Sequence, residues 1–161
     1  MPRPDSPPTN GPTSIRQAVR RCQQDKGFMS ALSELYQSVD LEISKKKAIC
    51  LGGGACCKFD LAGHRLYLST GEVAILTAIA PPDAGRCLVL RCPYQFGPRC
   101  AAHEYRPLGC RAFFCSRELQ SWSRSTYENY HRRIRQLHEM RCLPYTYAEL
   151  TAWLSQLLIT T

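Results

Sequence analysis

Cysteine is the residue that most constrains how this chain can fold, because eight of its ten cysteines fall between residues 50 and 115. A chain of 161 residues can bury a hydrophobic core without crosslinks, so size alone does not call for them. Clustered cysteines indicate a disulfide framework in a secreted protein and a metal site in a reducing compartment. The first 14 residues hold no apolar stretch like that of a secretory signal, which favours a cytoplasmic location and a metal site.

Seven of these cysteines lie in loop-like segments flanked by glycine or proline, whereas Cys87 falls in an expected strand. The seven are Cys50, Cys56, Cys57, Cys92, Cys100, Cys110 and Cys115. Neither the upstream cysteines, at 50–57, nor the downstream ones, at 92–115, have the ligand pattern of a simple zinc finger. Iron–sulfur clusters accept more varied loops. We expect four of the seven to bind one zinc ion or one iron–sulfur cluster, beginning with Cys50, Cys56, Cys100 and Cys110. Reduced structural thiols or disulfides are the alternative.

The downstream cysteines stand in a specific pattern, C-x-x-Y-x-x-R-P-x-x-C-R-x-F. Six positions match it, namely Cys100, Arg106, Pro107, Cys110, Arg111 and Phe113, and His103 replaces the tyrosine. Upstream, Cys50, Cys56 and Cys57 fit the first, third and fourth cysteines of a CxxCxxCC motif, with Gly53 at the second. Over residues 50–115 the sequence therefore resembles the zinc- or iron-chelating domain family named after that motif. A related motif occurs in the bacterial flagellin lysine methylase, where it looks like an iron–sulfur site.

Three residues beside the cysteines have side chains suited to contact the metal centre. Arg106 and Arg111 flank Cys110, and a guanidinium can neutralise thiolates or pair with acids at the rim of a site. Phe113 can shield the centre from water. His64 and His103 lie near the cysteine loops and are possible further ligands, whereas His131 and His138 are expected on a solvated or core-edge helix face.

The sequence outside the cysteine motifs predicts a mainly α fold. We expect a small helical domain with a loop-rich cysteine centre and one short hairpin. We expect a disordered tail over residues 1–13 and a single domain over 14–161, with its metal-binding core at 50–115. Apolar periodicity and capping signals predict helices over 14–48 with an interruption at Gly27, over 70–80, over 125–140 and over 146–159. A short strand is expected over 65–69. No apolar run approaches the length of a membrane span, so no membrane partner is expected.

The net charge of +8 allows other function classes. Arginines on the first and third helices could form a phosphate-binding patch in a zinc-organised nucleic-acid-binding module. A lysine methylase-like enzyme is the other alternative, although no phosphate loop, nucleophile elbow or HExxH motif is present. The interpretation that we carry forward is a metal-binding protein with a structural or electron-transfer role, and its protein partner is unknown.

Overall fold

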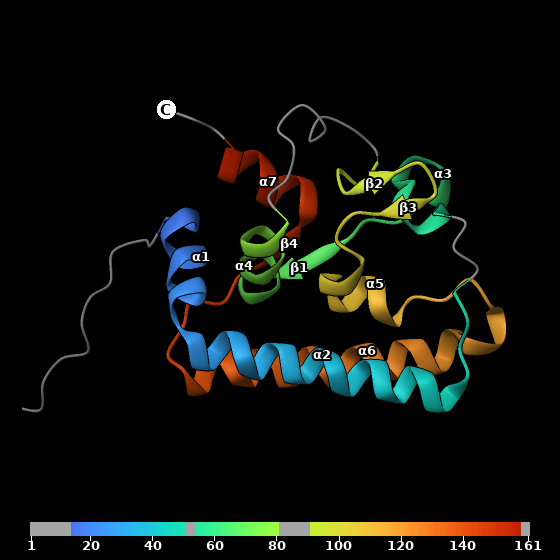
Figure 1. Ribbon diagram of the computed structural model, residues 1–161, viewed down its shortest axis with the longest axis horizontal. Coiled ribbons are helices and arrows are strands. Elements are labelled where there is room, and N and C mark those ends of the chain that lie inside the picture. The colour runs from blue at the N-terminus through green and yellow to red at the C-terminus, as the bar shows by residue number, and fades with distance from the viewer. Residues whose placement is uncertain (1–13, 51–53, 81–90, 159–161) are drawn as a thin grey trace, which may run out of the picture.

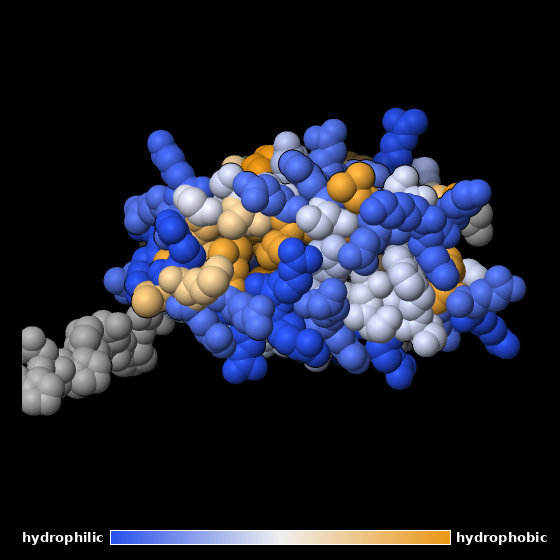
Figure 2. Space-filling model, turned by 90° about the horizontal axis from the view of Figure 1, so that it is seen from below, coloured by the Kyte–Doolittle hydropathy of each residue, from blue (hydrophilic) through white to orange (hydrophobic). Residues whose placement is uncertain are grey.

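The computed structural model describes residues 14–50, 54–80 and 91–158 and is mainly helical, which confirms the predicted fold class. Two long helices, α2 (Lys26–Lys46) and α6 (Gln120–Met140), lie side by side and form one layer of the molecule (Figure 1). The shorter helices α1 (Ile15–Gln24), α4 (Thr70–Ile79), α5 (Leu108–Ala112) and α7 (Leu150–Leu158) pack above that layer. The α2–α6 layer, seen from below in Figure 2, is mostly hydrophilic outside, with hydrophobic residues showing through in several places.

The strands form two small antiparallel pairs. The predicted hairpin is present as β2 (Gln95–Phe96) and β3 (Arg99–Cys100), joined through Gly97, whose φ of 57° favours glycine. The second pair joins β1 (Tyr67–Ser69) to β4 (Tyr147–Glu149), far apart in the sequence. The smaller elements η1 (Ala55–Cys57), α3 (Phe59–Ala62), η3 (His103–Tyr105) and η4 (Arg117–Leu119) complete the described fold.

Three predicted helix boundaries were wrong, each for a local reason. The first helix breaks at Asp25 rather than Gly27, because the Asp25 carboxylate caps the next helix by accepting the N–H of Phe28. Helix α6 begins at Gln120, and Ser125 lies inside it, with its hydroxyl bonded back to the carbonyl of Trp122. The last helix begins at Leu150, because residues 147–149 pair with β1 as a strand.

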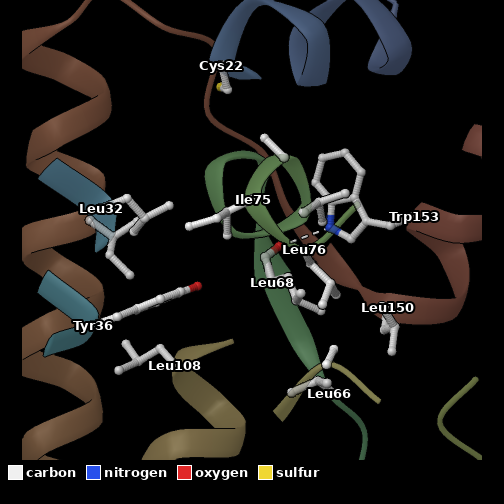
Figure 3. Packing of buried hydrophobic residues seen from close by; sticks show 14 of the residues in the cluster. Cys22, Leu32, Tyr36, Leu66, Leu68, Ile75, Leu76, Leu108, Leu150 and Trp153 are labelled. Atoms are coloured by element: carbon white, nitrogen blue, oxygen red, sulfur yellow. Dashed lines mark hydrogen bonds between the residues drawn. The ribbon is translucent and has the colours of Figure 1, made fainter. Parts of the chain in front are cut away.

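Both ends of the chain contribute to one hydrophobic core. Leu32 and Tyr36 of α2 face the core from one side, and Trp153 of α7 enters from the other (Figure 3). The buried Trp153 indole donates a hydrogen bond of 3.0 Å to the carbonyl of Leu68, so its polar edge is satisfied. Leu66, Leu76 and Leu150 belong to this core and also line the cavity of the cysteine region.

His138 is fully buried within this core, not on the solvated or core-edge face that its spacing predicted. Its Nε2 accepts the backbone N–H of Gly71 at 3.2 Å, and its ring meets that of Phe28 edge to face. A side chain at Gly71 would collide with both rings, since a Cβ there would lie 2.5 Å from Phe28 and 2.8 Å from His138. Helix α4 therefore needs glycine here to approach α2 and α6 closely.

Burial of His138 predicts a loss of stability in mild acid. Desolvation lowers the pKa of the His138 ring in the folded chain. The unfolded chain therefore binds a proton at this ring near pH 6.5, whereas the folded chain does so only at a lower pH. The contribution of the neutral, buried ring to the free energy of unfolding is fully present above pH 6.5. Below that pH it falls by up to about 1.4 kcal/mol per pH unit until the lowered pKa is reached. Urea unfolding at pH 7.5 and at pH 5.5 would measure this effect. Between the two pH values, the free energy of unfolding should fall less in H138Q than in the parent chain. An equal loss in both proteins would contradict this prediction.

Candidate metal centre

Six of the seven predicted ligands line one cavity of about 690 Å³, and the thiol of one of them, Cys50, is exposed. The other five come from four separate segments and are Cys56, Cys57, Cys92, Cys100 and Cys110. Electrostatic interactions connect these thiols, since Cys57 interacts with Cys56, Cys92 and Cys100, and Cys110 interacts with Cys56, Cys57 and Cys100. We call this group the five-thiol cluster.

The first two thiols are positioned by a tight turn that requires glycine. Gly54 has a φ of 64°, and its carbonyl accepts the N–H of Cys57 at 3.1 Å and the side-chain amide of Gln95 at 3.2 Å. A Cβ at Gly54 would lie 2.7 Å from that amide nitrogen. The carbonyl of Cys57 in turn accepts the N–H of Cys92 at 2.8 Å, which holds the second cysteine segment against the first.

Cys100 is brought to the cavity by the hairpin. Its backbone lies opposite Gln95 in the β2–β3 register, and the N–H of Ala101 donates to the carbonyl of Tyr94 at 2.8 Å. The backbone N–H of Ala102 donates to the Cys100 thiol. A backbone donor of this kind favours a thiolate.

Cys110 is positioned by the buried carboxylate of Glu72 on helix α4. Glu72 is 1% exposed, and its Oε1 accepts the N–H of Leu108 at 2.8 Å, the second residue before Cys110. Its Oε2 accepts from the backbone and hydroxyl of Ser69, completing a capping box. The Ser69-x-x-Glu72 pattern could have identified the box, but the contact to α5 spans 36 residues and carries no local signal.

Arg111 fastens the cysteine loop to the helical layer. Its side chain is 4% exposed, and its Nη1 lies 2.6 Å from an Asp40 carboxylate oxygen of α2. The other guanidinium nitrogens donate to the carbonyls of Arg106, at 2.7 Å, and Glu104. The guanidinium also lies over the ring of Tyr36, 4.3 Å from its centroid. The guanidinium donors of Arg111 are therefore engaged by Asp40 and by two loop carbonyls. Arg111 thus positions the loop that holds Cys110 and does not contact the thiols through these donors.

Arg106 faces the thiols instead. Its charge lowers the pKa of Cys56, Cys100 and Cys110, opposing the larger upward effects on each of them. Its Nε is buried and has no hydrogen-bond partner among the described residues. A buried donor without an acceptor is costly, and a thiolate sulfur in the cavity would satisfy it.

The pKa values of four of these thiols, those of Cys56, Cys57, Cys100 and Cys110, are raised above the ordinary value of a cysteine. Burial, followed by Cys57, Cys56 and Cys100, raises the pKa of Cys110. The Cys56 hydrogen bond lowers the pKa of Cys57, but the Cys92 hydrogen bond and burial raise it to about 11. Metal ligation therefore requires the release of protons to form thiolates.

The other predicted residues lie at the edge of the cavity or outside it. Cys50 lines the cavity with an exposed thiol, whereas Cys115 is exposed and is not among the lining residues. Phe113 is 43% exposed at the rim and stacks on His64. His103 also lines the cavity. Across the described ranges, no group of three or more cysteine, histidine or acidic side chains is already arranged to hold a metal ion, so ligation requires the thiols to turn towards a common point.

Comparisons with family models, curated proteins and solved structures found no match for this chain. The resemblance to the CxxCxxCC family therefore stays a prediction based on residues 50–115.

Proposed function

We propose that this chain binds an iron–sulfur cluster through four thiolates of the five-thiol cluster, with zinc as the alternative metal. The observation that carries the proposal is the convergence of five cysteines from four segments on one cavity. Thiolate sulfur is the donor that both iron–sulfur clusters and structural zinc use.

The size of the cavity favours a cluster over a single zinc ion. A structural zinc site is closed, with four ligands about 2.3 Å from the ion if all are thiolates. The cavity of about 690 Å³ is instead in the size range of cofactor sites. The role of the centre would be structural or electron transfer, because a metal joining the segments of Cys57, Cys92 and Cys110 would crosslink loops that have little core of their own.

The nucleic-acid alternative receives less support from the described surface. Several arginines assigned to a phosphate patch bond within the protein, including Arg16 to the carbonyl of Gln156 and Arg21 to that of Cys142. Arg135 lies 3.5 Å from the Glu139 carboxylate on the same helix. No helix in the described ranges is both long and apolar enough to cross a membrane.

A pair of alanine substitutions tests the ligand set. C100A removes a thiol of the five-thiol cluster, and C115A removes an exposed thiol outside it. After purification under identical anaerobic conditions, we expect C115A to keep the metal content of the parent chain. C100A should hold substantially less metal or release it faster to a chelator, because Cys92 or Cys57 must then complete the site. Equal retention by the two variants would remove Cys100 from the ligand set.

A further inference from the structure

A second pocket, of about 230 Å³, lies against the five-thiol cluster. Cys56 and Cys110 line both this pocket and the larger cavity, so the two hollows share part of a wall. Residues of β1, β4, α5 and α6, the segment before β1 and Phe113 form the rest of the pocket, which we call the aromatic pocket.

Two stacked ring pairs line the aromatic pocket. Tyr67 and Tyr147 have ring centroids 5.5 Å apart at an angle of 27°, and the β1–β4 pairing brings them together. His64 and Phe113 have centroids 5.2 Å apart at 23°. Tyr127 of α6 joins the first pair, since its hydroxyl lies 2.5 Å from that of Tyr147. The hydrogen bonds and stacking preorganise five rings around a small volume.

Three of these rings are unusually exposed for large apolar groups. Tyr67 and Phe113 are each 43% exposed, and Tyr147 is 40% exposed. Exposed aromatic residues around a hollow are typical of ligand sites rather than of an inert surface.

The described lining of the aromatic pocket suits a cation. Arg65 is the only arginine or lysine among the described lining residues, and its guanidinium is 2.8 Å from the Glu149 carboxylate, which compensates its charge. Aromatic faces carry negative potential and attract organic cations.

We propose that the aromatic pocket binds a small organic cation of the alkylammonium class. The rings would contact the alkyl groups around the nitrogen, and their negative faces would attract its charge. Because Cys56 and Cys110 form part of the wall, the bound cation would lie beside the thiol centre. This inference goes beyond the proposed metal binding and does not depend on it, since the rings are in place without a metal.

A matched pair of probes tests the proposal on the full chain. Choline carries a quaternary ammonium group, and 3,3-dimethylbutan-1-ol has the same shape without the charge. In titrations followed by calorimetry or tyrosine ring NMR signals, choline should bind at least about five-fold more tightly than the neutral alcohol. Y67L should weaken choline binding by about five-fold. The control F96L also replaces an exposed aromatic, but one that does not line the pocket, and it should leave choline binding unchanged.

Equal affinities for the two probes, or equal binding by Y67L and F96L, would overturn the cation site. Metal content measured on the same samples keeps this outcome separate from the proposed function. A chain that purifies without metal but prefers choline would contradict the metal centre and leave the cation site standing.

Discussion

Replacing Cys110 by alanine should remove the bound metal and much of the order of the cysteine loops together. Cys110 interacts with three other thiols of the five-thiol cluster, and the Glu72 contact to Leu108 holds its helix in place. A ligand whose free concentration is a thousand times its Kd stabilises the folded chain by about 4 kcal/mol. C110A should lose a large part of such a stabilisation by the metal. Metal analysis and thermal unfolding of the same preparation, with and without chelator, would measure both effects.

Cys22 offers a matched control for this experiment. Its thiol is fully buried on α1, and burial raises its pKa to about 12, but it is not among the cavity-lining residues. C22A should keep the metal and lose about 1 kcal/mol of stability from the lost packing. If C110A also kept its full metal content, Cys110 would not be a ligand.

Replacing Arg111 by alanine should destabilise the fold by about 3 kcal/mol, because loss of its buried guanidinium leaves hydrogen-bond acceptors unsatisfied. The substitution would leave the carbonyls of Glu104 and Arg106 without their donor and would remove the cation over Tyr36. R111K should recover only part of the loss, because a lysine cannot donate to three acceptors in the same fork geometry. Urea unfolding of both variants would measure the free-energy differences.

The exposed Arg124 on α6 is the control for Arg111. R124A should change the free energy of unfolding by no more than about 0.5 kcal/mol. A similarly small effect of R111A would show that the contacts of Arg111 do not fasten the cysteine loop. Metal affinity should also fall in R111A, because Cys110 is the adjacent residue.

Much of the architecture could be predicted from local patterns, and the errors came from long-range contacts. Apolar spacing predicted the helical layer and the helix after residue 70. The strand at 147–149 was missed because only its pairing with β1 makes it a strand, and in isolation its residues resemble a helix cap. His138 was misplaced because spacing on its own helix cannot show that α2 and α4 cover it.

The candidate site shows the same division between local and long-range information. Cysteine number and spacing predicted a centre within residues 50–115, and six of the seven residues do line one cavity, five of them as the five-thiol cluster. Sequence could not separate Arg106, which faces the thiols, from Arg111, which bonds to α2 and two loop carbonyls. It also missed Glu72 as the anchor of α5 and the aromatic pocket, because both depend on segments distant in the chain.

The central claim is that the five-thiol cluster binds a metal centre, and the composition of the purified chain tests it most directly. The protein would be purified anaerobically, and one sample would be used for a visible absorption spectrum and for iron, sulfide and zinc analysis. The account predicts the broad visible absorbance of an iron–sulfur cluster with iron and sulfide in matching amounts. One zinc per chain and no colour would assign the alternative metal. A chain with neither metal, whose cysteines are joined in disulfides, would contradict the account.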